Sequence, residues 1–125
     1  MVKKIGILLV ILMVMLVGCG REESASDTQM RNGLLYIINE SKPFTGKLVD
    51  YYDNDQLKLV KHFKNGEAHG EVESYYSNGQ LEVKGTYKHG ICDGVRVEYA
   101  PNGEVVLDLE YKDGKLIKGP KWLME

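Results

Sequence analysis

The sequence predicts an all-β protein: one elongated, twisted antiparallel meander of about seven or eight strands, built from two-strand repeats of 24 residues after a cleaved N-terminal signal helix. Three observations predict this fold: a recurrence every 24 residues, dipeptides that favour tight turns, and alternating apolar residues between the turns. The structural residues that recur are the glycines Gly46, Gly70 and Gly94 and the aromatics Phe63, Tyr87 and Tyr111. Repeats of this kind complete their core only against their neighbours.

The first element, residues 1–18, is interpreted as a signal peptide. Lys3 and Lys4 precede a 13-residue apolar run, Ile5–Val17, which is shorter than the ~20 residues that a membrane-spanning helix needs. The run ends in a tetrapeptide that resembles a bacterial lipobox, namely Leu16, Val17, Gly18 and Cys19. The resemblance implies that Cys19 becomes the lipidated first residue of an exported, membrane-anchored chain, with the choice of membrane left open. The alternatives are an ordinary cleaved signal and an uncleaved anchor helix.

Residues 19–33 are expected to form the lipidated cysteine and a flexible polar tether. Seven of the eight residues from Glu22 to Gln29 are polar or charged and offer almost nothing to bury. Such a segment holds a folded domain away from the lipid surface. The repeat domain is then expected over residues 34–119, followed by a C-terminal tail at residues 120–125.

The charge balance and the cysteines narrow the class of partner. Without Lys3 and Lys4 the 16 basic residues fall to 14, against 18 acidic ones, which gives a net charge of −4. Nucleic acids and anionic lipids need a basic face, so neither is expected as the main partner. If Cys19 carries lipid, Cys92 has no disulfide partner within the chain and is expected to be a small apolar residue.

Six tight turns divide the repeats into strands. They are Asn54–Asp55, Asn65–Gly66, Asn78–Gly79, His89–Gly90, Asn102–Gly103 and Asp113–Gly114, spaced alternately by 11 and 13 residues. Two-residue turns of this type need positive φ at both central positions and match the twist of paired strands. Antiparallel pairs are therefore expected between residues 46–52 and 57–63, between 70–76 and 81–87, and between 94–100 and 105–111.

The register follows by counting outward from each turn. Tyr76 is expected opposite Leu81, and every recurring glycine lies opposite a recurring aromatic. The pairs are Gly46 with Phe63, Gly70 with Tyr87 and Gly94 with Tyr111. A ring that covers the bare backbone opposite it would be the aromatic rescue of a strand glycine.

The two faces of the sheet are expected to differ. Along the outgoing strands every second residue is apolar and most of the residues between are charged, as in Leu57, Lys58 and Leu59. The more polar face nevertheless carries one row of tyrosines, Tyr51, Tyr75 and Tyr99, once per repeat. The row is interpreted as cross-strand packing that stiffens the sheet, and it is also the candidate binding face.

A motif runs through the repeats. Phe63–Gly70 and Tyr87–Gly94 share the form aromatic-x-x-Gly-x-x-x-Gly, and a Tyr-x-x-Asn-Gly-x-Leu stretch lies between them. This pattern resembles the bacterial variant of the MORN repeat, found in proteins labelled YwqK-type antitoxins. The resemblance covers Leu34 to about Gly119 and implies an elongated, twisted antiparallel sheet without catalytic residues. The sequence departs from it at Asp55, Ala100 and Lys118, and the last unit is cut short.

No metal, cofactor or catalytic site is expected. Four side chains fall at one end of the sheet, His69, His89, Cys92 and Asp93. Equivalent turns of successive repeats lie about 9.6 Å apart, however, which is too far for their side chains to share one ion. Serines, histidines and carboxylates are dispersed along the ribbon instead of meeting in a pocket.

The lipobox and the repeats together predict a non-enzymatic, lipid-anchored protein that presents a sheet surface to another macromolecule of the cell envelope, most simply a protein. One alternative is an antitoxin or immunity protein that neutralises an envelope-acting toxin. Another is a cell-wall or glycan-binding module that uses the rings of Tyr51, Tyr75 and Tyr99. Because an apolar face is too large to leave bare, pairing of two copies through a face or an edge is left open.

Overall fold

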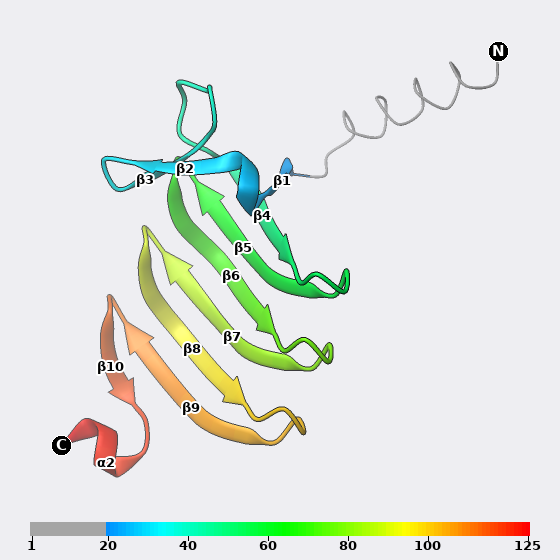
Figure 1. Cartoon of the computed structure of the whole chain (residues 1–125). Helices are drawn as coiled ribbons and strands as arrows, with labels where there is room; N and C mark the ends of the chain where they lie inside the picture. Colours follow the sequence, from blue (N-terminus) through cyan, green and yellow to red (C-terminus); the bar gives the residue numbers. More distant parts are fainter. Residues whose placement is uncertain (1–19) are drawn as a thin grey trace.

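The computed structural model describes residues 20–125, so the signal peptide, the lipobox and Cys19 lie outside the described residues. The described chain is mostly β-strand, with two single-turn helices (Figure 1). The elements are β1 (Glu22–Ser24), η1 (Ala25–Asp27), β2 (Thr28–Arg31), β3 (Leu34–Ile37), β4 (Gly46–Tyr51), β5 (Leu57–Lys64), β6 (Glu67–Tyr75), β7 (Leu81–Lys88), β8 (Ile91–Tyr99), β9 (Val105–Lys112), β10 (Lys115–Lys118) and α2 (Lys121–Met124).

One large sheet dominates the fold. Within residues 20–125 it contains eight strands in the order β1-β4-β5-β6-β7-β8-β9-β10. From β4 to β10 each strand pairs antiparallel with the next one along the chain, which confirms the expected meander. The strand β1 differs, because it lies parallel to β4 with Glu22 opposite Lys47. The strands are strongly bent and form one curved layer (Figure 1).

The expectation of a flexible tether over residues 19–33 is wrong for the part that the structure describes. Besides β1, this segment contains β2, which pairs with β3 in a separate two-stranded sheet. Asn32 and Gly33, with φ of 51° and 80°, form the two-residue turn between these strands. Backbone hydrogen bonds do not depend on side-chain hydrophobicity, so strand pairing orders a segment whose composition is polar.

The main core lies between the β2–β3 hairpin and the first strands of the large sheet (Figure 1). Four side chains that are 3–8% exposed form it, Leu35, Ile37, Phe44 and Leu48, with Ala25 and Phe63 packed against them. The backbone N–H of Leu35 donates to the carbonyl of Gly66 at 2.9 Å, which ties the hairpin to the turn after β5. Among the buried apolar side chains of residues 20–125, strands β7 to β10 contribute Leu109.

The turns at the two ends of the sheet are of different types. At one end both central residues have positive φ, as expected, in Asn65–Gly66, His89–Gly90 and Asp113–Gly114. At the other end positive φ begins one residue after the asparagine, at Asp55, Gly79 and Gly103. These are three-residue loops in which the residue of positive φ forms a bulge, so the expectation of two-residue turns is wrong there.

The extra residue shifts the register beside those three loops. The N–H of Tyr76 donates to the carbonyl of Gln80 at 2.8 Å, and Tyr75 rather than Tyr76 lies opposite Leu81. A second irregularity between Ser74 and Tyr75 restores the expected pairing further along the strands.

The C-terminal tail, residues 120–125, contains the single helical turn α2 after Pro120. None of the helices within residues 20–125 is long and apolar enough to cross a membrane.

Candidate binding surfaces and the repeat framework

Each recurring glycine lies opposite its aromatic partner, which confirms the expected pairs of Gly46 with Phe63, Gly70 with Tyr87 and Gly94 with Tyr111. The interpretation of these pairs as aromatic rescue stays a prediction. A Cβ at Gly70 would have His62 as its neighbour and a Cβ at Gly94 would have Thr86, and the tyrosine ring is not within 4 Å of either. Both glycines have φ of 107° beside irregularities of the β5–β6 and β7–β8 pairs. Glycine is needed there for the backbone conformation of a bulge.

Tyrosine and asparagine side chains join the first two three-residue loops to the next repeat. The hydroxyl groups of Tyr52 and Tyr76 donate to the carbonyls of Tyr75 and Tyr99, at 2.7 and 2.8 Å. The side-chain amides of Asn54 and Asn78 likewise donate to Ser77 and Pro101, at 3.2 and 3.3 Å. The third repeat has Ala100 in the tyrosine position, so it has no hydroxyl to donate onward. The sequence indicated a turn role for the asparagines but not these bonds between repeats. The recurrence of Tyr52 and Tyr76 at the 24-residue period is the pattern that could have predicted them.

The opposite ends of the strands are joined in a similar way, by backbone groups. The N–H of Gly90 donates to the carbonyl of Ala68 at 2.8 Å, and the N–H of Gly114 to the carbonyl of Cys92 at 3.0 Å. The repeats are therefore connected at both ends of the sheet as well as by strand pairing.

The tyrosine row, the candidate binding face, has one well-exposed member. Tyr51 is 52% exposed, whereas Tyr75 and Tyr99 are half-buried. The three residues end strands β4, β6 and β8, which are separated by β5 and β7. The ring contacts found within residues 20–125 lie elsewhere, so the row is not a stack of rings. Tyr75 donates to the carboxylate of Glu73, and this hydrogen bond raises the pKa of Tyr75 to about 12.

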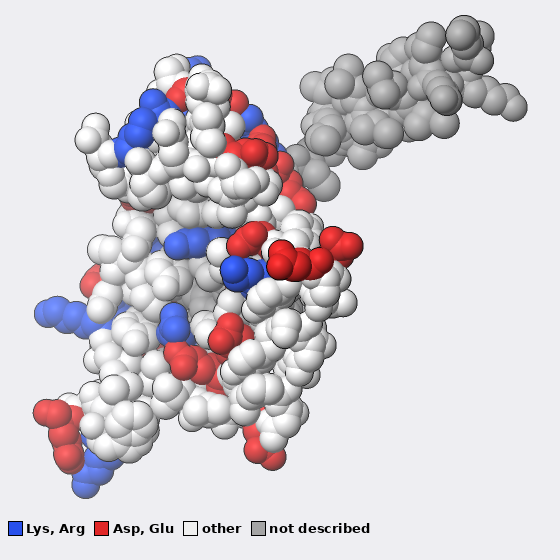
Figure 2. All heavy atoms as spheres, viewed as in Figure 1, with Lys and Arg blue, Asp and Glu red and all other residues white. Residues whose placement is uncertain are grey.

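The face that the hairpin partly covers is hollowed below it and carries charged side chains of both signs among uncharged ones (Figure 2). The Nζ atom of Lys61 lies 5.4 Å from the ring centroids of both Phe63 and Tyr87. Arg96 donates to Glu98 at 3.0 and 2.8 Å. Burial would lower the pKa of Arg96, but the hydrogen bonds to Glu98 raise it above its ordinary value. The face is therefore less apolar than the alternation on the outgoing strands predicts.

The histidine end of the sheet brings together two of the four side chains weighed for a metal. The rings of His69 and His89 meet edge to face at 5.5 Å between centroids, and Nδ1 of His89 lies 3.5 Å from Glu67. An open pocket of about 350 Å³ beside them is lined by Lys88, His89, Ile91, Asp93 and Asp113. Burial raises the pKa of the Cys92 thiol, which disfavours the thiolate. Residues 20–125 contain no group of three or more side chains placed to hold a metal ion.

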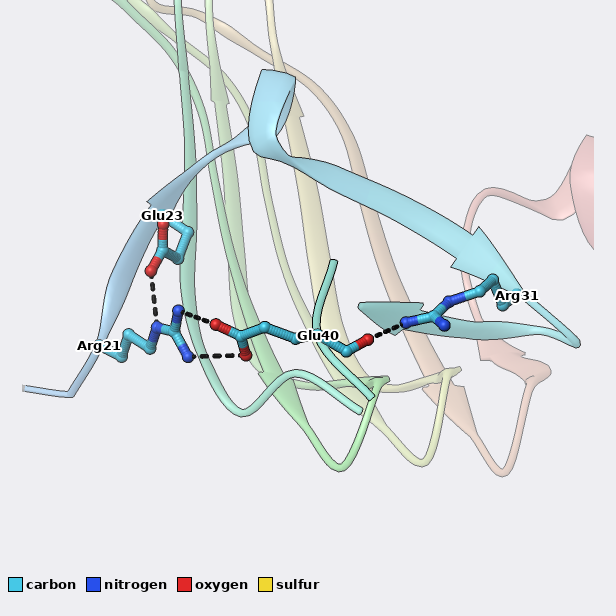
Figure 3. Close-up of polar contacts among 4 residues, drawn as sticks. All are labelled: Arg21, Glu23, Arg31 and Glu40. Atoms are coloured by element: carbon cyan, nitrogen blue, oxygen red, sulfur yellow. Dashed lines mark hydrogen bonds and ion pairs between the residues drawn. The ribbon is translucent and has the colours of Figure 1, made fainter. Parts of the chain in front are cut away.

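The N-terminal strand is held by an ion-pair cluster that the sequence did not predict (Figure 3). Arg21 donates to both carboxylate oxygens of Glu40, at 2.6 and 3.0 Å, and to Glu23 at 2.6 Å. Arg31 donates to the backbone carbonyl of Glu40. The hydrogen bonds to Glu40 and Glu23 raise the pKa of Arg21, and Arg21 lowers the pKa of Glu40. Arg21 and Glu40 are 19 residues apart, so no local sequence pattern indicates that their side chains meet.

Comparison with known proteins agrees with this framework. Residues 44–65, 68–89 and 93–117 match the MORN repeat variant, and the first two stretches span the pairs β4–β5 and β6–β7. No curated protein and no solved structure matches the chain. The matched stretches cover more than half of the sequence, so the chain belongs to the family of MORN repeat variant proteins.

Proposed function

We propose that this protein is a non-enzymatic recognition module of the bacterial cell envelope, anchored through lipid on Cys19, which binds a protein partner through its sheet. The observation that carries the proposal is exposed apolar surface on the last strands of the array. Val95, Val105 and Val106 are 53%, 60% and 61% exposed. Apolar surface that a soluble domain leaves uncovered marks interaction sites.

The framework of the repeats supports this role. Hydrogen bonds join the repeats at both ends of the strands, so the sheet can present a surface of fixed shape. A preorganised surface loses little conformational entropy on binding.

Anchoring is tested by following the N-terminal cysteine. The full chain is expressed in a bacterium, and we expect it in the membrane fraction, with an N-terminal peptide whose mass corresponds to diacylglycerol on Cys19. The variant Cys19→Ala should leave the membrane fraction, whereas Cys92→Ala is the matched control and should remain. If Cys19→Ala stays in the membrane and no lipid is found on the wild-type peptide, the anchoring proposal is wrong.

Recognition is tested by crosslinking the anchored chain in its own cells. We expect a defined envelope protein to be captured, and capture of partners exclusively from the cytoplasm would contradict the proposal.

A second candidate function is binding to a repeating glycan, which is favoured by the exposed ring of Tyr51 and its recurrence once per repeat. Aromatic rings offer flat apolar surfaces for stacking. The test is retention on cell-wall material of a variant that combines Tyr51→Ala, Tyr75→Ala and Tyr99→Ala. Retention equal to that of the wild type would remove this candidate.

A further inference from the structure

The outer edge of β9 is only half covered. β10 lies opposite β9 at Lys112, Tyr111 and Glu110, and its pairing ends there. In the described chain, residues 105–109 of β9 have a strand on the β8 side and none on the other.

The repeat period explains why β10 stops early. The equivalent strands β6 and β8 each have nine residues, whereas β10 has four. Counted by the period, Lys118 stands where Gly70 and Gly94 have φ of 107°, a conformation that lysine disfavours. Two residues later Pro120 lacks an N–H for pairing. The chain then leaves the sheet and enters α2, where Trp122 is 70% exposed.

The register identifies which backbone groups are left open. Lys112 and Lys115 flank the two-residue turn Asp113–Gly114, so they form a hydrogen-bonded pair. Alternation along β9 places the N–H and C=O of Glu110 and Asp108 on the outer edge. The β8–β9 register shifts between Glu98 and Tyr99, so Val106 is a bulge residue whose N–H faces β8, and the next outward groups are those of Val105. Lys118 lies opposite Glu110, whereas Asp108 and Val105 have no opposite residue there within residues 20–125.

The side chains along this open edge have a distinct chemistry. Val105 and Val106 are about three-fifths exposed, and Asp108 forms no ion pair with another described residue. Opposite charges across a strand pair are favourable, as for Glu73 of β6 opposite Lys84 of β7. A strand with a basic residue opposite Asp108 would form such a pair at the outer edge.

We propose that the open edge of β9, residues 105–109, binds an extended segment of a partner protein in which apolar and basic residues alternate, and adds it to the sheet as a further strand. This inference rests on the proposed recognition function and names the surface and the kind of partner. A second copy offering its own outer strand β1 would bring Glu22 and Glu23 to the acidic edge, so like charges oppose that pairing.

The probe is a synthetic peptide of about seven residues that alternates valine and lysine. Its matched control carries N-methyl groups on alternate backbone amides, which keep the side chains but block strand pairing. Calorimetry should find the valine-lysine peptide bound by the full chain, with N-methylation weakening binding at least ~10-fold. Hydrogen exchange of the Val105 and Asp108 amides should slow ~10-fold or more on binding. Absence of binding, or binding that leaves both amides unprotected, would overturn the proposal.

Three variants locate the contact. Val105→Pro removes an outward N–H without removing one that faces β8, and Val105→Thr keeps that N–H and serves as the matched control. We expect Val105→Pro to weaken peptide binding at least ~10-fold and Val105→Thr to retain it. Asp108→Lys should reverse the preference toward a valine-glutamate peptide, and this variant tests the edge if Val105→Pro fails to fold. Equal binding by Val105→Pro and Val105→Thr, or an unchanged preference in Asp108→Lys, would overturn the proposal.

Crosslinking of the anchored chain separates this inference from the proposed function. If an envelope partner is captured equally by the wild type and Val105→Pro, recognition stands and the edge proposal is wrong. If no envelope protein is captured although the peptide binds, the edge proposal stands and the proposed function is wrong. If sedimentation shows that the wild type self-associates and Val105→Pro does not, the occupant is a second copy and the proposed occupant is wrong.

Discussion

The two edges of the large sheet differ in how much of the chain covers them. At the N-terminal end β1 covers the edge of β4, and the β2–β3 hairpin supplies Leu35 and Ile37 to the main core. Arg21, Glu23 and Glu40 form an ion-pair cluster there. At the C-terminal end β10 is short, α2 is exposed, and part of β9 has no outer neighbour. A repeat array needs end units that differ from its interior, and here one end is closed while the other stays open.

Single substitutions at the closed N-terminal end should lower the free energy of unfolding more than substitutions at the open C-terminal end. Phe44 is 3% exposed in the main core, so Phe44→Ala should lower the free energy of unfolding by about 3–5 kcal/mol. Trp122→Ala, at the open end, should change it by less than about 0.5 kcal/mol because the ring is exposed. Urea denaturation measures both. Similar losses for the two variants would remove the contrast between the ends.

A backbone position at the closed end should be nearly as sensitive. Gly46 has φ of 153°, and a Cβ there would collide with the backbone carbonyl of Arg21. Gly46→Ala should therefore displace the start of β1 and cost about 1–3 kcal/mol from strain alone. Gly90→Ala is the comparison, since its φ is also positive but nothing lies within 4 Å of the added carbon. Thermal unfolding should rank Gly46→Ala as the more damaging change, and the reverse order would contradict this account of β1.

The hydrogen bonds between loops should matter inside the array and not at its open end. Tyr76→Phe removes the bond to the Tyr99 carbonyl and should cost about 1 kcal/mol. Ala100→Tyr restores the missing tyrosine of the third repeat, but no fourth loop follows to accept its hydroxyl. Its effect on unfolding in urea should be close to zero. A gain in stability similar in size to the Tyr76→Phe loss would show that the hydroxyl finds another partner.

The ion-pair cluster should give the smallest effect, and one that depends on pH. Arg21 lowers the pKa of Glu40 in the folded chain, so its contribution is present above the ordinary glutamate pKa and is lost as the pH falls through the lowered value. The groups are exposed, so solvent screens the interaction. Unfolding measured from neutral to acidic pH should show Glu40→Gln slightly less stable than the wild type at neutral pH, with the difference vanishing in acid. A difference that persists at low pH would assign it to packing.

The open half of the molecule was well predicted from sequence and the closed half was not. Recurring turn dipeptides determined the order of β4 to β9 and the pairing of Gly70 with Tyr87, because local backbone chemistry decides both. The segment from Arg21 to Arg31 was misjudged from its polar composition. Strand pairing satisfies the backbone of Glu22–Ser24 whatever side chains it carries, and the dipeptide Asn32–Gly33 was a turn signal of the same type as the others.

Of the candidate binding surfaces, one could be predicted from the sequence and the other could not. The position of Tyr51 at the end of its strand could be expected from the period, whereas the open edge of β9 depends on where β10 leaves the sheet. That departure reflects Lys118 and Pro120 in a unit that no longer follows the repeat. Only the structure gives the register that leaves the outward groups of Val105 and Asp108 without an opposite strand.

Native-state hydrogen exchange of the full chain tests the difference between the ends most directly. We expect the slowest exchange in β4 and β5, declining protection toward β9, and fast exchange at the Val105 and Asp108 amides even though they lie within a strand. Protection that is uniform from β4 to β9, or strong protection of Val105 and Asp108 in the free protein, would contradict a closed N-terminal end and an open C-terminal edge.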